Sequence, residues 1–178
     1  MNPRMSPAIA RALVPVFRLL TRAEYLFGTI ARRPYLRLLG LRDAAERDLR
    51  RGRLKAAAAK ASELLSLAEE FPKDWFYGNA IHHGHLLLGR IALAQGDAAT
   101  AANELLAAGK TPGSPQLDSF GPNCQLALDL LRAGDRAPVL EYLELCGRFW
   151  KHDFGRRITW LEEVRQGGEP DFGANLAY

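Results

Sequence analysis

The sequence predicts an all-α protein, built as a stack of about three helical hairpins with helical caps. Apolar residues recur at three- and four-residue spacing in successive segments, which is the period of a helix with one buried face. Ala and Leu are abundant, whereas long alternating runs of Val, Ile and Thr are absent. Short turns that contain Gly separate the segments, as expected for helices that fold back on their neighbours.

The segment Asp74–Gly109 shows the plan most clearly. A helix is predicted over residues 79–95, with Ile81, His85 and Leu88 along one face. Gly96 ends it, and Asp97 can cap a second helix that packs back on the first. Small residues, Gly89 and Ala101, would let the two helix backbones approach closely.

The same plan is predicted on either side of this hairpin, so the helical-repeat domain covers residues 41–151. The other predicted helices span residues 41–51, 54–71, 123–133 and 136–150. Residues 110–122 hold three Pro and two Gly, which indicates an ordered or semi-ordered loop within the domain. A C-terminal cap is expected at residues 152–168, with a helix over 154–166 whose apolar face runs through Phe154, Ile158, Leu161 and Val164. The remainder, residues 169–178, has no periodicity and is predicted to be an irregular tail.

Residues 1–40 are predicted to form a basic helical cap. Residues 1–42 carry eight Arg and one acidic residue, a net charge of +7, although the whole chain carries only +4. Two short helices are expected, over residues 6–20 and 21–33. An alternative is that residues 1–38 dock on an anionic membrane surface, since basic amphipathic helices suit acidic headgroups. Nucleic acid is not an expected partner, because no aromatic–basic recognition module is present.

The composition also indicates where in the cell the protein is expected. Two cysteines in 178 residues do not make a disulfide framework, so a reducing, cytoplasmic location is expected, with peripheral membrane association as the alternative. No apolar run approaches the roughly 18 residues of a membrane-spanning helix.

An internal repeat supports the hairpin assignment. The segments that begin at Leu49, Leu93 and Leu131 align without gaps about their turn glycines, and these leucines are expected to be buried equivalently. Residues seven before, five after and twelve after each turn Gly are small or apolar: Ala45, Gly89 and Ala127; Ala57, Ala101 and Val139; Leu64, Ala108 and Cys146. This pattern resembles the tetratricopeptide repeat. The turns are 44 and 38 residues apart, compared with about 34 in that family.

The resemblance implies a right-handed stack whose first helix in each pair lines a concave surface and holds a partner protein. The segments GNAIHHGH (residues 78–85) and SPQLDSFGPN (residues 114–123) also look like those of a bacterial family of repeat proteins, a resemblance that implies no activity. The binding positions carried over by spacing are Arg42, Glu46, Arg50, Asn79, His83, Leu86, Arg90, Asn123 and Cys124. Arginines at such positions can pair with carboxylates. Arg90 in particular is expected to serve binding and to contribute little to stability.

Three of the four histidines cluster at His82, His83 and His85. His82 and His85 are weak candidates for metal ligands, because they stand three apart on one helix. No third ligand stands at a recognised spacing, so neither a metal nor another cofactor is expected. The more ordinary interpretation is that His85 is a hydrogen-bonded core residue and that His83 faces the groove.

The favoured function is a non-enzymatic adaptor that binds an acidic or carboxylate-bearing segment of a partner protein in the concave groove. One alternative is a small enzyme, or an accessory subunit of one, that uses the histidine cluster with Asn123 or Cys124. The other is a membrane-surface adaptor that docks through the arginine-rich N-terminus.

Overall fold

All regular secondary structure in residues 34–177, the part of the chain that the computed structural model describes, is helical. The all-α prediction is therefore confirmed for these residues. The chain divides into two units, residues 1–37 and 38–178. Of the first unit only residues 34–37 are described, and they are helical. The helices predicted at 6–20 and 21–33 lie outside the described residues.

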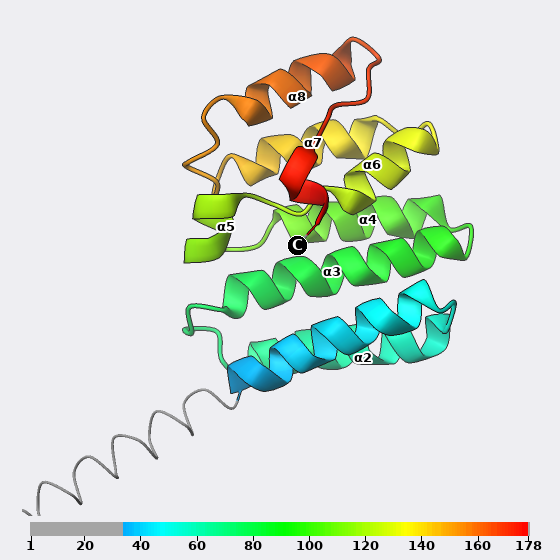
Figure 1. Ribbon diagram of the computed structural model, residues 1–178, viewed down its shortest axis with the longest axis vertical. Helices are drawn as coiled ribbons and strands as arrows, with labels where there is room; N and C mark the ends of the chain where they lie inside the picture. The colour runs from blue at the N-terminus through cyan, green and yellow to red at the C-terminus, as the bar shows by residue number, and fades with distance from the viewer. Residues whose placement is uncertain (1–33, 178) are drawn as a thin grey trace, which may run out of the picture. The chain divides into compact units, whose positions relative to one another are not determined.

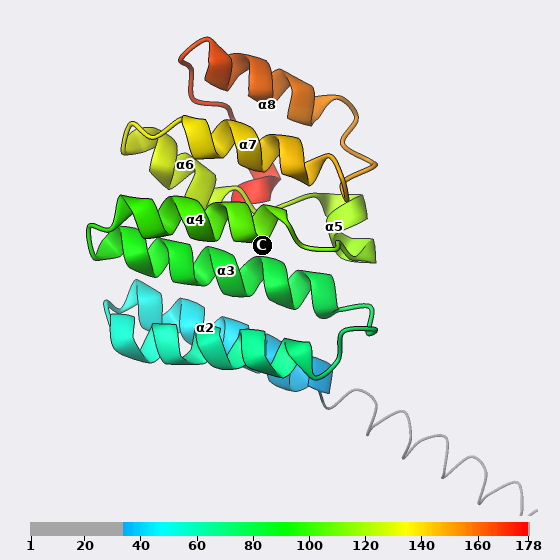
Figure 2. The same cartoon turned by 180° about the vertical axis from the view of Figure 1, so that it is seen from behind.

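The helices up to α8 follow one another along a stack in chain order, as Figures 1 and 2 show from opposite sides. The first described helix covers residues 34–50. It is followed by α2 (Leu54–Glu69), α3 (Tyr77–Ala94), α4 (Ala98–Gly109), α5 (Pro115–Phe120), α6 (Gln125–Arg132), α7 (Ala137–Cys146), α8 (Arg156–Arg165) and the 3₁₀ helix η1 (Gly173–Leu176). The helix predicted from residue 41 thus already includes residue 34. None of the helices in residues 34–177 is long and apolar enough to cross a bilayer.

The three repeat turns have the same backbone geometry. Gly52, Gly96 and Gly134 adopt positive φ angles of 69°, 83° and 88°. In each turn the residue after the glycine donates its N–H to the carbonyl five residues earlier, at 2.9, 3.0 and 2.9 Å. This is the Schellman pattern that ends a helix at a left-handed glycine. Asp97 caps the following helix as predicted, since its side chain accepts a hydrogen bond from the N–H of Thr100 at 2.9 Å.

The small residues of the repeat lie where helices cross. All nine repeat positions named above are buried. A Cβ atom added to Gly89 would meet the Leu126 side chain and would lie 3.2 Å from the carbonyl oxygen of Ala101. The backbones of α3 and α4 therefore approach closely, as the sequence predicts. The leucines before the turns are less uniform than expected, because Leu131 is buried while Leu49 and Leu93 are only partly buried.

The largest difference from the predicted elements lies at the end of the stack. The helix expected from residue 154 begins at Arg156, and Phe154 precedes it with a positive φ of 51°. Phe154 therefore lies outside α8, and the face that α8 buries does not include Ile158. Phe154 is 86% exposed and Ile158 is 52% exposed, so their predicted burial is wrong. Leu161 and Val164 are buried as predicted, and Trp160 completes the buried face of α8.

Two other segments are more ordered than the sequence indicates. Residues 110–122 contain the six-residue helix α5, which starts after Ser114, whose side chain accepts a hydrogen bond from the N–H of Leu117. The tail folds back onto the stack, with Phe172 and Asn175 each 1% exposed. The ring of Phe172 packs edge-on against Trp160, with centroids 5.0 Å apart. The tail is thus part of the core.

Candidate functional site

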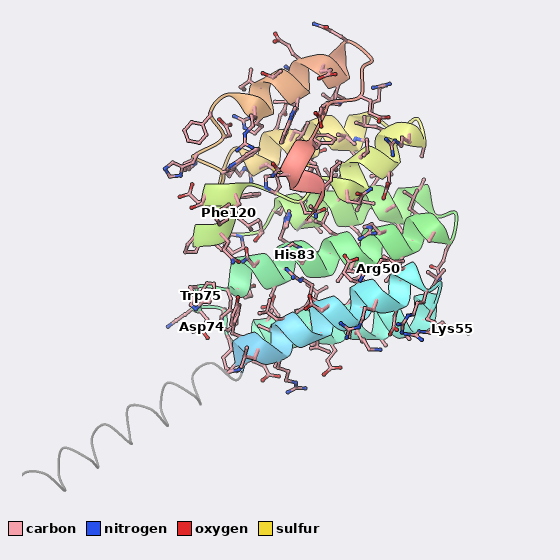
Figure 3. All side chains as sticks on the ribbon, viewed as in Figure 1. Arg50, Lys55, Asp74, Trp75, His83 and Phe120 are labelled. Carbon is pink, nitrogen blue, oxygen red and sulfur yellow. The ribbon has the colours of Figure 1, made fainter. Side chains whose placement is uncertain are left out.

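A cavity of about 440 Å³ opens between the 34–50 helix, α3, the loop before α6 and the end of the tail. We call it the basic pocket. It is lined by Arg42, Asp43, Glu46, Arg47, Arg50, His83, Arg90, Asn123, Gln125, Leu176 and Ala177. Six of the nine binding residues predicted from the sequence are among them. Figure 3 shows two of these, Arg50 and His83, on the same face of the stack.

The charges in the pocket are unevenly compensated. Arg90 on α3 pairs with Glu46, at 2.9 Å, and Glu46 also lies 3.4 Å from Arg50. Arg42 pairs with its neighbour Asp43 at 3.1 Å. Arg47 is exposed and forms no ion pair or side-chain hydrogen bond with any residue in the described part of the chain. Four arginines against two carboxylates leave the pocket with a positive charge and one guanidinium available to a ligand.

His83 forms part of the pocket wall as a neutral imidazole. Burial lowers its pKa well below the ordinary value, and the neighbouring His82 and Arg42 act in the same direction. No side chain or backbone group within residues 34–177 forms a hydrogen bond with the ring, which packs edge-on against the ring of His82 with centroids 5.4 Å apart. A neutral imidazole carries one N–H donor and one acceptor, so His83 can donate a hydrogen bond to an anion.

Asn123 is held in the pocket by its backbone. Its N–H donates to Nε2 of His82 at 3.1 Å, and its carbonyl accepts from the hydroxyl of Tyr142 at 2.7 Å. Asn175 fixes the two flanking residues: its side chain donates to the carbonyl of Pro122, and its carbonyl accepts from the N–H of Cys124. The loop before α6 is therefore fixed by contacts from three distant parts of the chain.

His82 is the buried structural histidine of the cluster. Its Nδ1 lies 3.1 Å from the carbonyl of Ala108. Because Nε2 accepts from Asn123, Nδ1 must carry the proton and donate. Burial is the main reason that the pKa of His82 falls to about 4. The prediction that His85 is hydrogen-bonded is confirmed, since its Nδ1 lies 2.7 Å from Oε2 of Glu104, but its placement in the core is wrong, because His85 is partly exposed.

Three predicted binding residues lie outside the basic pocket. Asn79 borders a separate cavity, and its side-chain oxygen Oδ1 accepts from the hydroxyl of Ser114 at 2.6 Å. Leu86 and Cys124 are 4% and 0% exposed, so their assignment to the groove is corrected. Leu86 is buried because α3 packs between α2 and α4, which leaves only a narrow strip of α3 at the surface. Cys124 precedes α6 and points its thiol at the carbonyl of Pro122, 3.8 Å away.

The geometry gives little support to metal or nucleophile chemistry at the histidines. Both ring nitrogens of His82 are engaged by backbone groups, so a metal ion would have to displace one of them. Within residues 34–177 no group of three His, Cys, Asp or Glu side chains is placed to hold a metal ion. Burial raises the pKa of both Cys124 and Cys146, which disfavours the thiolate that a nucleophile needs.

Sequence reasoning missed five residues of the pocket. The four-residue spacing that selected Arg42, Glu46 and Arg50 passes over Asp43 and Arg47, which stand one position further along the same helix. Asp43 and Arg47 are themselves four residues apart, so they form a second row on the helix beside Arg42, Glu46 and Arg50. This spacing is the signal that could have found them. Gln125 begins α6, one position beyond the predicted residues. Leu176 and Ala177 carried no local signal, because tertiary contacts bring the tail to the pocket.

Comparisons of the chain with family models, with curated proteins and with solved structures found no match. The function proposed below therefore follows from the chemistry of the pocket.

Proposed function

We propose that the protein is a binding protein that captures an acidic segment of a partner protein in the basic pocket. The observation that carries this proposal is Arg47, an exposed arginine that lines the pocket and forms no ion pair with the described residues. A guanidinium in such a position can bind a carboxylate through two parallel hydrogen bonds. The remaining arginines maintain a positive field around it.

A peptide segment suits the pocket better than an isolated anion. Asn123 and Gln125 add amide groups to the arginines. The side-chain N–H of Gln125 is used by Asp129 at 2.8 Å, which leaves the Gln125 carbonyl oxygen to accept from a peptide N–H. The pocket can thus address both the carboxylate and the backbone of a partner segment.

The stack itself is proposed to be of the tetratricopeptide type, with the pocket on its concave side. Supporting this are the identical turns at Gly52, Gly96 and Gly134 and the burial of the small residues around each turn. In such a stack each hairpin buries its apolar face only against its neighbours, so the first helix of each pair is available for binding. The unequal turn spacings of 44 and 38 residues are the departure from the family pattern.

The test compares fluorescein-labelled peptides, one Glu-rich and one with Gln at every Glu position, by fluorescence anisotropy. We expect the Glu peptide to bind more tightly, and Arg47→Glu to weaken it by about tenfold or more through loss of the bidentate pair and added repulsion. Arg47→Lys should weaken it less, because an ammonium lacks the planar fork. The thermal stability of these variants should stay at the wild-type value, since Arg47 holds no partner in place.

The matched control is Arg51→Glu, which makes the same charge change four residues further along and outside the pocket. It should leave the affinity for the Glu peptide within about twofold of wild type, since exposed charges act weakly through screened solvent. Equal losses for Arg47→Glu and Arg51→Glu would show that general charge, and not the pocket, attracts the peptide. No preference for the Glu peptide over the Gln peptide would overturn the proposed function.

A further inference from the structure

A second cavity adjoins the basic pocket. It has a volume of about 300 Å³ and is lined by Arg42, Asn79, His83, Gln116, Leu117 and Phe120. We call it the side chamber. Arg42 and His83 line both cavities, so the two cavities meet at these side chains. Figure 3 shows His83 between Phe120, at the end of α5, and Arg50.

The two cavities differ in chemistry. The side chamber has no carboxylate and one arginine in its lining, whereas the basic pocket has four arginines. Phe120 is 62% exposed at the edge of the side chamber, although large apolar side chains are most stable when they are buried. Leu117, beside it, is 1% exposed and extends the apolar wall. An apolar or aromatic group would therefore be favoured here and a charged one in the basic pocket.

Hydrogen bonds from two other parts of the chain hold α5, the helix that carries Phe120. Asn79 hydrogen-bonds with both Ser114 and Gln116 at the start of α5. The carbonyl of Phe120 itself accepts from Asn175 at 3.0 Å. These contacts position α5 before any ligand arrives, so less conformational entropy is lost when a ligand binds.

We propose that the partner segment carries a large apolar or aromatic residue within two positions of its acidic residue, and that this side chain enters the side chamber against Phe120. This inference rests on the proposed function, since the acid in the basic pocket sets the register of the segment. Arg42 and His83, which form the common wall, contact both side chains of the pair. The ligand is thus defined by two features, an anion and an adjacent apolar group.

The experiment uses four fluorescein-labelled peptides of equal length, which combine Glu or Gln at the anionic position with Phe or Ala at the apolar position. Phe is placed one or two residues from Glu in separate peptides, and the tighter register is used. We expect the Glu–Phe peptide to bind about tenfold more tightly than the Glu–Ala peptide, as burial of part of an aromatic ring provides. Phe120→Ala should remove this preference and leave the affinity for the Glu–Ala peptide unchanged.

The matched control is Phe154→Ala, which removes another exposed phenylalanine that lines neither cavity. It should keep the full preference for the Glu–Phe peptide. Melting temperatures of both variants check that they are folded. If the Glu–Phe and Glu–Ala peptides bind equally in both registers, or if Phe120→Ala keeps the preference, the side chamber is not a binding site, while the proposed function stands. If neither Glu peptide binds more tightly than its Gln counterpart, the proposed function itself fails.

Discussion

Nη1 of Arg90 on α3 lies 2.9 Å from Oε1 and 3.1 Å from Oε2 of Glu46, on the 34–50 helix. Both side chains are largely shielded, with 24% and 28% of their surfaces exposed. Arg90 therefore does more than line the pocket, because it ties two successive layers of the stack together. The sequence-based expectation that Arg90 contributes little to stability overlooked this ion pair.

We predict that Arg90→Glu lowers the free energy of unfolding by about 1–3 kcal/mol, because it sets a carboxylate against Glu46 in a partly buried site. Urea denaturation measures the change. The charge-swapped double variant, Arg90→Glu with Glu46→Arg, should recover a large part of the loss. No recovery in the double variant would mean that the pair contributes nothing and that Arg90 acts through packing.

A second prediction concerns pH. The folded-state pKa of His82 is about 4, compared with about 6.5 for an unperturbed histidine. Between these values the unfolded state binds a proton that the folded state excludes, so acidification favours unfolding. Stability should be complete above pH ~6.5 and should decline as the pH falls toward ~4, by about 3 kcal/mol in total from this residue.

The low pKa of His82 also has a local structural cause. A protonated Nε2 would place its N–H against the N–H of Asn123, so two hydrogen-bond donors would face each other. Urea denaturation at a series of pH values measures the slope in wild type and in His82→Leu. The variant should be less stable at neutral pH, since the N–H of Asn123 and the carbonyl of Ala108 each lose the bond to His82, but its stability should change less with acidification. A His152→Gln variant controls for the removal of a surface histidine. An unaltered slope in His82→Leu would assign the acid sensitivity to other groups.

A third prediction concerns the crossing of α3 and α4. Gly89→Ala should destabilise the protein by about 1–3 kcal/mol, because an added Cβ overpacks a closed site. That atom would lie 3.1 Å from Cβ of Glu104 and 3.2 Å from the Ala101 carbonyl oxygen, and it would also press on Leu126. Gly40→Ala is the matched control, since nothing lies within 4 Å of its added Cβ. This helical control should be neutral or stabilising by up to ~1 kcal/mol.

A fourth prediction concerns the tail. Asn175→Ala removes the donor to the carbonyls of Phe120, at 3.0 Å, and Pro122, at 2.7 Å. We expect a loss of about 2–4 kcal/mol in the free energy of unfolding, since buried carbonyls lose their partners. Asn103→Ala, at an exposed position in α4, should have no such effect. If the two variants are equally stable, the docked tail does not contribute to folding.

The features that the sequence determined by itself depend on residues close together in the chain. The period of the apolar residues, the glycine turns and the small residues at the helix crossings specify the hairpins, because these signals depend on neighbours a few positions apart. The pattern of arginines on residues 42–50, with His83 and Arg90 on α3, also located most of the basic pocket.

What only the tertiary structure decided depends on contacts between distant residues. Which histidine is buried was decided by Ala108 and Asn123, which satisfy both nitrogens of His82 from 26 and 41 positions away. Phe154 and Ile158 carry an apolar helical pattern, yet both are exposed, because α8 starts after Phe154 and buries Trp160, Leu161 and Val164. The tail has no periodic signal, and it is ordered because Phe172 and Asn175 find buried partners that periodicity along the chain does not reveal.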